Sequence, residues 1–550
     1  MASDAAFMEK LVSLCRRRGF IFQSSEIYGG IGGFWDYGPL GVELKRNIKN
    51  AWWHDYVTCP PDGPDGKPVQ MVGLDCSIIM NPKVWEASGH ATGFADPMVS
   101  CKAEGCKALF RADKVFHVEL MRAEGEAPLD SFSVEADSLE DARAAAATLS
   151  GKIAKKHGGQ PLASRIAPFM AAAAQGLAGI KCPRCGTVGC LTEPRQFNLM
   201  NETHVGALQD AASKAYLRPE TAQGIFVNFK NVLDTSRVKV PFGIAQVGKA
   251  FRNEVNPRNF TFRSREFEQM EIEFFCNEQD SMQWWEFWRD HRVNWYKKLG
   301  LAGDKLRPRN QTTEELAHYS KACTDIEYMF PFSDEPQELE GVAHRGCFDL
   351  TQHAKHSGVD LNYFDEQSWS QLLADRKARG EPELTKEQKS ELGGKPPYRF
   401  LPTVIEPSAG ADRATLAFLC EAYTEDTKPD SKGNPQTRVY LRFHPRLAPI
   451  KAAFLPLVNK EGMPELADKL YRDARRHTNV FFDDGGSIGR RYARMDEAGA
   501  PYCITIDGDT VKAEGENAGM VTIRDRDTLA QERVHHSRVV EWLRAKIEQD

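Results

Sequence analysis

The stretch Arg252-Asn253-Glu254, followed by Arg263-Ser264-Arg265-Glu266-Phe267, decides how this chain is interpreted. Residues two apart on a strand point to one face, so we expect the side chains of Arg252 and Glu254 to enter one pocket. Guanidinium groups bind phosphate oxygens, a carboxylate accepts from the amino group of a base, and a ring offers a stacking surface. The stretch therefore predicts a nucleotide site. The alternative is a surface hairpin with solvated charges.

The flanking segments predict an antiparallel hairpin. Gly243–Phe251 is short and apolar, as expected of a buried strand, and Asn256–Asn259 has the composition of a turn. Beyond the turn, polar and apolar side chains alternate: Phe267, Gln269, Glu271 and Glu273 on one face, and Glu268, Met270, Ile272 and Phe274 on the other. This pattern predicts a polar face that lines a site and an apolar face that packs on a core.

Length and composition indicate a multidomain protein with no membrane segment. The chain has 550 residues, and a single core stops growing near ~250–300 residues. The net charge of -6 excludes a uniformly basic nucleic-acid binder but permits local basic patches. There is neither a signal pattern nor an apolar run of ~18–20 residues, so we expect a cytoplasmic protein.

Periodicity outlines the N-terminal part and three insertions. Leu40, Leu44, Ile48 and Trp52 form an apolar stripe on a helix that begins at Pro39, and the stripe fits a core or an oligomer interface equally well. Residues 120–180 are rich in alanine and charge with little strand signal, which predicts a peripheral helical module. We expect further helical insertions near 276–335 and 365–395.

The C-terminal part has a compact α/β pattern. It begins after Pro445, and its last helix is predicted over Asp527–Ile547. Gly485–Gly489 is favoured as a turn that begins a helix over a phosphate loop, because its glycine spacing fits neither common fingerprint.

The cysteines suggest one metal cluster. Thirteen are scattered along the chain, which favours reduced thiols over a disulfide framework. The spacing of Cys182 and Cys185 suits zinc, and Cys101 and Cys106 are their expected partners, with Cys190 as a possible substitute. Four protein ligands would make this zinc structural. The alternative is a set of unrelated thiols.

A third segment completes the pattern. Ile405–Arg413, followed by Ala414–Ala422, predicts a strand, a glycine turn and a helix with Arg413 in its first turn. With the Pro39 helix and the Arg252 hairpin, this segment resembles, in order, the three motifs of class II aminoacyl-tRNA synthetases. The chain resembles the glycyl-tRNA synthetase family in particular, at Tyr216–Gly224, Glu406–Ser408, Pro501–Asp507 and Val521–Asp527.

The resemblance covers nearly the whole chain except the insertions. It implies an α+β fold: an antiparallel sheet flanked by helices, a C-terminal α/β anticodon-binding domain and a zinc-type insertion. The expected domains are residues 1–98 and 191–445 for the catalytic domain, 99–190 for the insertion with the cysteines, and 446–550 for anticodon binding. The implied function is ATP-dependent activation of glycine and its transfer to tRNA(Gly) by a homodimer that uses Mg²⁺. Rival interpretations are an inactive derivative, a ligase without tRNA and a pure RNA-binding module.

The resemblance also implies roles for residues. Arg252 would hold the α-phosphate of ATP, Glu254 would read adenine, and Phe267 would stack on it. Arg413, the second catalytic residue, would cover the other adenine face or reach the γ-phosphate, and Glu338 would help to hold magnesium. The implied ATP-binding set is Arg252, Asn253, Glu254, Phe262, Arg263, Ser264, Arg265, Glu266, Phe267, Glu338, Leu339, Gly410, Ala411, Asp412 and Arg413. The implied glycine-binding set is Arg111, Glu220, Phe267, Glu268, Gln269, Met270, Glu271, Glu406, Pro407, Ser408, Ala409 and Gly410. Candidate tRNA contacts are Arg490, Arg491, Arg494, Arg524 and Arg526.

Overall fold

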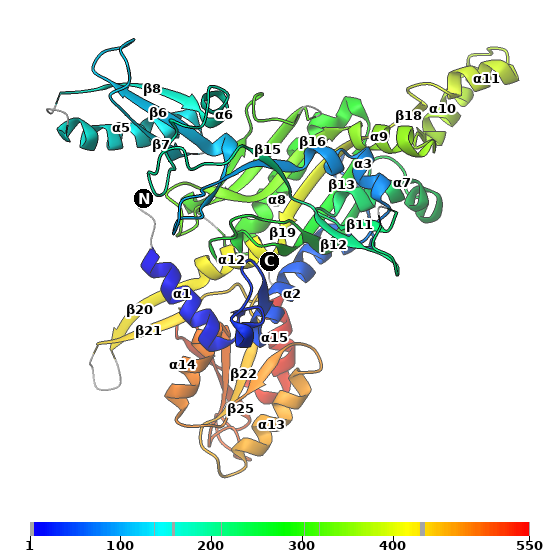
Figure 1. Cartoon of the computed structure of the whole chain (residues 1–550). Coiled ribbons are helices and arrows are strands. Elements are labelled where there is room, and N and C mark those ends of the chain that lie inside the picture. The colour runs from blue at the N-terminus through cyan, green and yellow to red at the C-terminus, as the bar shows by residue number, and fades with distance from the viewer. Residues whose placement is uncertain are drawn as a thin grey trace. The chain divides into compact units, whose positions relative to one another are not determined.

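The computed structural model describes residues 5–136, 138–156, 160–210, 212–301, 303–317, 320–429 and 435–548, so the outer ends of the first and last expected domains lie outside it. The chain divides into two compact units, which Figure 1 displays as one ribbon. Unit 1 comprises Met1–Ser88, Leu217–Phe251 and Pro257–Asp550, and unit 2 comprises Gly89–Tyr216 and Arg252–Asn256.

A seven-stranded sheet forms the centre of unit 1. Its strand order is β14-β15-β16-β19-β13-β12-β3, with antiparallel neighbours except for the parallel pair β12–β3. The strands are β3 (Gln70–Gly73), β12 (Phe242–Phe251), β13 (Glu266–Cys276), β14 (Leu306–Asn310), β15 (Ala322–Tyr328), β16 (Gln337–Gly346) and β19 (Thr403–Gly410). The predicted antiparallel sheet is confirmed.

The predicted hairpin is β12 paired with β13, from Phe242 opposite Phe275 to Phe251 opposite Glu266. The prediction that Arg252 and Glu254 lie on one face of this strand is wrong. β12 ends at Phe251, and the amide of Glu254 donates to the carbonyl of Arg252 at 2.7 Å. Arg252 and Glu254 therefore lie in a tight turn beyond the strand, and they belong to unit 2.

Helices cover the two faces of the sheet. The described helices of this part are α1 (Ala5–Arg18), α2 (Pro39–Trp53), α3 (Pro82–Ala87), α7 (Ala222–Ser236), α8 (Ser281–Lys298), α9 (Phe348–Ser357) and α12 (Ala411–Ala422). Met270, Ile272 and Phe274 of β13 join a core with α2, α8 and α12. Phe275, on the other face, packs with α7 and α9. The apolar stripe on α2 packs in the first core, so the core is the correct one of the two alternatives and not an oligomer interface.

The segment 276–335 is not a helical insertion. It supplies α8 and two strands of the central sheet, β14 and β15. The segment 365–395 does carry the helices α10 (Glu366–Ala378) and α11 (Lys386–Gly393), near the short strands β17 (Tyr363–Phe364) and β18 (Arg399–Phe400). The remaining short sheets of unit 1 are β1 (Ile21–Gln23) with β2 (Trp35–Tyr37), and β20 (Tyr423–Pro429) with β21 (Pro435–Leu441).

The C-terminal part of unit 1 is the expected α/β domain. Its sheet has the order β23-β22-β24-β25-β26. Its strands and helices are β22 (Ala452–Pro456), α13 (Met463–Ala474), β23 (Val480–Phe482), α14 (Ile488–Ala498), β24 (Tyr502–Ile506), β25 (Met520–Asp525), β26 (Gln531–His535) and α15 (Val539–Ile547). The prediction of a helix over Asp527–Ile547 is wrong in its first half, because Gln531–His535 pairs with β25 as an edge strand. The segment Gly485–Gly489 leads into α14, which begins at Ile488 after the N-cap residue Ser487.

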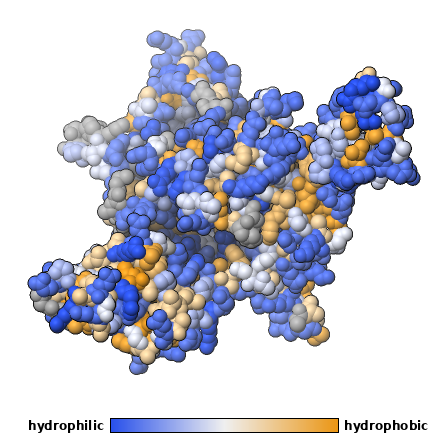
Figure 2. All heavy atoms as spheres, turned by 90° about the horizontal axis from the view of Figure 1, so that it is seen from above, coloured by the Kyte–Doolittle hydropathy of each residue, from blue (hydrophilic) through white to orange (hydrophobic). Residues whose placement is uncertain are grey.

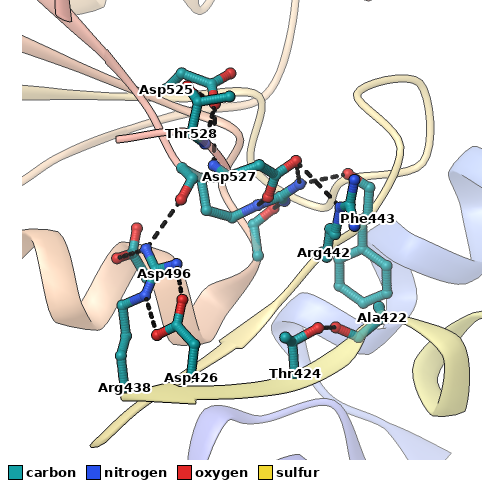
Figure 3. Close-up of polar contacts among 12 residues, drawn as sticks. Ala422, Thr424, Asp426, Arg438, Arg442, Phe443, Asp496, Asp525, Asp527 and Thr528 are labelled. Atoms are coloured by element: carbon teal, nitrogen blue, oxygen red, sulfur yellow. Dashed lines mark hydrogen bonds and ion pairs between the residues drawn. The ribbon is translucent and has the colours of Figure 1, made fainter. Parts of the chain in front are cut away.

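Charged side chains join this domain to the β20–β21 hairpin (Figure 3). Arg438 lies between Asp426 and Asp496, and Arg524 makes two 2.9 Å hydrogen bonds to Asp496. The guanidinium of Arg526 donates to the carbonyls of Gly499 and Phe443. These bonds fix the domain to the rest of unit 1.

The same contacts correct the expected tRNA contacts. Arg491, Arg524 and Arg526 are buried and occupied with backbone or carboxylate partners. Arg494 pairs with Asp483, and only Arg490 of the five is exposed.

Unit 2 contains two three-stranded sheets, β5-β4-β9 and β7-β6-β8. Its elements are α4 (His90–Gly93), β4 (Ala95–Ser100), β5 (Leu109–Arg111), β6 (Val115–Met121), β7 (Asp130–Glu135), α5 (Leu139–Lys156), β8 (Ala163–Pro168), α6 (Phe169–Ala173), β9 (Arg195–Asn198), β10 (Asn201–His204) and β11 (Lys214–Leu217). The alanine-rich segment was expected to be helical. It contains the helix α5 but also the strands β7 and β8, and Ala142 and Ala146 of α5 pack with Val118 and Leu120 of β6.

The face of the molecule in Figure 2 is mostly hydrophilic, with scattered hydrophobic patches. Among the described residues, no helix combines the length and apolar composition that a bilayer crossing requires.

Candidate active site

A buried group of carboxylates lies on the face of β13 that also carries Phe275. Carboxylate oxygens of Glu271, Glu273 and Glu406 lie within 4.8 Å of one another. Thr221 donates its hydroxyl to Glu271, and the Ser408 hydroxyl donates to the same carboxylate at 2.7 Å. We call the group of Glu220, Glu271, Glu273 and Glu406 the carboxylate pit.

Burial sets the protonation of the pit. It raises the pKa of Glu271 to about 8, and the negative charges of Glu406 and Glu220 add to the effect. Burial also raises the pKa of Glu406, which the neighbouring Arg345 opposes. Such a pit suits a cation that brings its own charge and hydrogen-bond donors.

A second layer of polar residues holds the pit from behind. Arg345, on β16, donates to Glu406 at 2.5 Å and to both oxygens of Asp349. Gln223 donates to Asp349 at 2.9 Å and to Glu220 at 3.0 Å. Because the carbonyl oxygen of Gln223 can only accept, its 2.8 Å contact with His353 requires a proton on Nε2 of the imidazole.

A cation and a ring lie together at the start of α12. The guanidinium of Arg413 is 4.6 Å from the ring centroid of Phe262, and it donates to the backbone carbonyl of Glu338 at 3.1 Å. One oxygen of the Glu338 carboxylate is 3.4 Å from Arg413. Phe262 is supported by Phe330 beneath it. Arginine above an aromatic ring offers a flat, positively charged surface for a base or a phosphate.

Strand alternation removes several expected residues from this site. Glu268 and Asp412 face α2, where both contact Lys45. Met270, Leu339, Ala409 and Ala411 are buried in the core on that side. Glu268, Met270, Leu339 and Ala409 point away from the pit because neighbouring residues of one strand point to opposite faces, and Ala411 and Asp412 lie in the first turn of α12.

The loop before β13 is held by the glycine-rich segment that precedes β2. Arg265 donates from its backbone amide to Gly33 and from its guanidinium to Gly32. Ser264 is buried and donates to Thr261, while Glu266 pairs with Lys249. Gln269 lies in the pit, where its amide is 3.3 Å from the Ser408 hydroxyl.

In unit 2, Arg252 and Arg111 lie among aromatic and acidic groups. The guanidinium carbon of Arg252 is 5.7 Å from the ring centroid of Phe94. The backbone amide of Asn253 donates to Leu199 at 2.7 Å. Arg111 pairs with Asp113 at 2.7 Å and with Asp96 at 3.2 Å.

The predicted metal ligands are brought together. The Sγ atoms of Cys101, Cys106, Cys182 and Cys185 all lie within 4.8 Å of one another. The Cys101–Cys185 and Cys106–Cys182 separations are 3.7 and 4.0 Å. A zinc ion with Zn–S bonds of about 2.3 Å requires S–S edges of about 3.8 Å, so these four thiols fit tetrahedral zinc. Cys190 does not belong to this group of four, although its Sγ lies 3.3 Å from that of Cys101, and its thiol donates to the carbonyl of Thr187 at 3.1 Å.

Comparison with known proteins gives the family. Residues 204–369 match the class II tRNA synthetase core domain for G, H, P, S and T, and residues 451–546 match an anticodon binding domain. A glycine–tRNA ligase of Rhodopirellula baltica is 50% identical to this chain, over 98% of the chain and 99% of that protein. The chain belongs to the glycine–tRNA ligase family.

Two other glycine–tRNA ligases have the same full-length match. The protein of Thermobifida fusca is 44% identical over 100% of this chain and 99% of its own length. That of Lachnoclostridium phytofermentans is 45% identical over 96% of both chains. The class II fold and the ligase function inferred from the three motifs are therefore confirmed for this chain.

Sequence reasoning missed the layer of polar residues behind the pit. Thr221, Gln223, Arg345, Asp349 and His353 come from three separate elements, and their pairing has no local sequence signal. Glu273 did have a local sequence signal, because it continues the polar alternation of β13, although it was not assigned a role.

Proposed function

We propose that the carboxylate pit binds the ammonium group of glycine in the ligase reaction of this family. The observation that carries this proposal is the convergence of Glu271 and Glu406 within a buried space that also holds the hydroxyl of Ser408. Buried carboxylates are costly unless a cation or donors satisfy them, and an ammonium ion supplies both. Glycine has no side chain, so a pit closed around its Cα excludes the methyl group of alanine by steric contact.

ATP is assigned to the surface made by Arg413 and Phe262. The ring and the guanidinium are already 4.6 Å apart in this structure. Adenine would therefore bind beside this pair, with Phe267 on β13 as the expected stacking partner and Arg413 on the other face or at the γ-phosphate. The roles of Arg252 at the α-phosphate and of Glu254 at the adenine amino group rest on the motif in the sequence.

In this proposal the carboxylate of glycine attacks the α-phosphorus of ATP, and pyrophosphate leaves. The attacking oxygen is already ionised, so the enzyme needs no general base. It must align the reactants and stabilise charge on the phosphorus oxygens, which is the role assigned to Arg252. Glycine then passes from the adenylate to the terminal ribose of tRNA(Gly).

Two metals are part of the proposal. Glu338 has a carboxylate oxygen 3.4 Å from Arg413 and a side chain that is 55% exposed, so it is accessible to Mg²⁺ bound to ATP. Magnesium would neutralise charge on the phosphates. Zinc would be held by Cys101, Cys106, Cys182 and Cys185 and would stabilise the insertion.

A homodimer and a cytoplasmic location complete the proposal. The surface of unit 1 near β1 and β2 carries the large apolar side chains Ile27 and Tyr28, which are 88% and 87% exposed, and Ile31 nearby. Such exposure is typical of an interface. Sedimentation equilibrium should give twice the chain mass, and Tyr28→Glu should shift the protein towards monomer.

Glycine-dependent ATP–pyrophosphate exchange tests the activation step. We expect exchange with glycine and little with alanine or serine. The second step requires glycylation of tRNA(Gly), and exchange without glycylation would leave only an adenylate-forming ligase. Exchange with alanine equal to that with glycine would contradict the assignment of the pit.

A further inference from the structure

Two carboxyl groups of the pit face each other across neighbouring strands. β13 and β19 are antiparallel, with Glu271 opposite Ser408 and Phe274 opposite Ile405. This register brings Glu273 opposite Glu406 on the same face, and their oxygens lie within 4.8 Å. Like charges directly opposite in a sheet are destabilising, so this position disfavours two ionised carboxylates.

Glu273 differs from its neighbours in its hydrogen bonds. Glu271 accepts from Thr221 and Ser408, and Glu406 accepts from Arg345. Glu273 is 0% exposed, and among the described residues neither of its oxygens has a hydrogen-bond donor. An ionised carboxylate without donors in a buried site has a large desolvation cost, whereas a neutral acid supplies its own donor.

The charges around Glu273 indicate which carboxyl group keeps the proton. Glu406 on β19 and Glu271 on β13 are the neighbouring acids, and Arg345 on β16 is the neighbouring base. Arg345 contacts Glu406 directly at 2.5 Å, so the ionised form is favoured there. Burial, and after it the charge of Glu406, hold the pKa of Glu273 well above the usual range of a glutamate. The geometry and the electrostatics therefore agree.

We propose that Glu273 is a neutral carboxylic acid that donates its proton to Glu406 and thereby fixes Glu406 for the ammonium group of the substrate. Arg345 holds one oxygen of Glu406, and Glu273 holds the carboxylate from the facing strand. Glu273 is thus a positioning residue with no contact of its own to the substrate. This inference rests on the proposed binding of glycine in the pit and deepens it.

Two substitutions of Glu273 separate a neutral from an ionised side chain. Glu273→Gln keeps the shape and a donor, so the KM for glycine in pyrophosphate exchange should rise only about threefold. Glu273→Ala removes the donor to a charged acceptor, so the same KM should rise about 10- to 100-fold with a smaller change in kcat. Equal and large increases in both variants would overturn the proposal, because they would mean that a charge was lost.

An infrared difference spectrum measures the proton directly and does not depend on activity. The wild-type enzyme at pH 7 should show the carbonyl stretch of a protonated carboxylic acid that Glu273→Gln lacks. Absence of that difference would overturn the proposal even if the KM values agree. Thermal unfolding of both variants shows whether the Ala variant has lost its fold, in which case the Gln variant and the spectrum decide.

Glu271→Gln distinguishes a failure of this inference from a failure of the proposed function. If glycine binds in the pit, this variant should raise the KM for glycine by about 10- to 100-fold. An unchanged KM would remove glycine from the pit, and the inference that Glu273 positions a glycine contact would fall with it. A raised KM without the infrared difference would overturn only the inference about Glu273.

Discussion

Nζ of Lys45, on α2, lies 2.8 Å from Oδ1 of Asp412, the residue that precedes Arg413 on α12. The same carboxylate accepts from the hydroxyl of Tyr37 at 2.6 Å and from the backbone amide of Glu268 at 2.7 Å. One side chain therefore joins α2, β13 and α12 on the face of the sheet away from the pit. Asp412 therefore fixes the start of α12, directly before Arg413.

Asp412→Asn should weaken the use of ATP. The substitution leaves Lys45 with Glu268 as its carboxylate partner, which should cost about 1–3 kcal/mol of unfolding free energy. Displacement of Arg413 should lower kcat/KM for ATP roughly 10- to 100-fold. Urea denaturation and exchange kinetics measure the two effects. Glu425→Gln, which alters only exposed contacts with Lys10 and the Tyr423 hydroxyl, is the matched control and should change stability by less than about 1 kcal/mol. Unchanged ATP kinetics in Asp412→Asn would contradict this role.

Arg252→Ala should lower glycine-dependent pyrophosphate exchange by about 10²–10³-fold, because it removes a cation assigned to the α-phosphate. The control is Arg258→Ala, an exposed residue that follows in the same loop. Near-normal exchange in Arg252→Ala would remove Arg252 from the proposed role.

Glycine binding should release protons at neutral pH. Burial raises the pKa of Glu271 to about 8, so at pH 7 this carboxyl group is mostly protonated. A bound ammonium ion favours the ionised form, so binding should release close to one proton, and affinity should rise as the pH approaches 8. Calorimetry in two buffers of different ionisation enthalpy measures the release. Equal heats in both buffers would argue against this titration, and Glu271→Gln should abolish the difference.

The raised pKa of Glu271 has the opposite effect on stability. The folded enzyme binds this proton more tightly than the unfolded chain, whose glutamate has a pKa near 4.5. The contribution of Glu271 to stability is therefore greatest below about pH 4.5 and declines as the pH rises towards 8. Against Glu271→Gln, the stability of the wild-type enzyme should fall with pH across this window.

Cys106→Ser should reduce the zinc content of the purified protein, whereas Cys190→Ser should retain one zinc per chain. The reason is that Cys106 belongs to the group of four thiols, while Cys190 donates to a carbonyl. Elemental analysis measures the metal, and limited proteolysis shows whether unit 2 loosens. Loss of zinc in Cys190→Ser but not in Cys106→Ser would reverse the assignment.

Arg524→Ala and Arg490→Ala should have different effects. Arg524 forms a buried pair with Asp496, so its loss should destabilise the protein by about 3–5 kcal/mol. Arg490 is exposed, so its loss should leave stability unchanged and weaken only the tRNA-dependent step. Denaturation and tRNA glycylation separate these effects. A stable Arg524→Ala protein with poor tRNA binding would restore Arg524 as an RNA contact.

The parts of the fold that the sequence predicts well have strong local periodicity. The helix α2 and the hairpin β12–β13 follow from apolar spacing, as does the junction at Arg413. The strand β14 could not be recognised, because it is polar. Its Arg307 and Arg309 pair with Glu327 across the sheet, so charge complementarity between strands takes the place of hydrophobic alternation.

The site divides in the same way. Glu271 and Glu406 could be predicted because each lies in a recognisable motif. The chain of contacts from His353 through Gln223 to Glu220 could not, because it joins α9 to α7 across a long separation in sequence. The glycine-binding set was assigned in continuous stretches, so it wrongly included Met270 and Ala409. Their neighbours on the strands face the pit, whereas Met270 and Ala409 face the core.

β19 ends at Gly410 and α12 begins at Ala411, with no loop between them. Glu406 and Ser408 on the strand and Arg413 on the helix therefore belong to one rigid strand–helix unit. A shift of this unit would move the groups assigned to the amino acid and to the nucleotide together. Changes in the core beneath it should thus alter the two Michaelis constants in step, and a new amino-acid specificity would be difficult to evolve here without loss in the use of ATP.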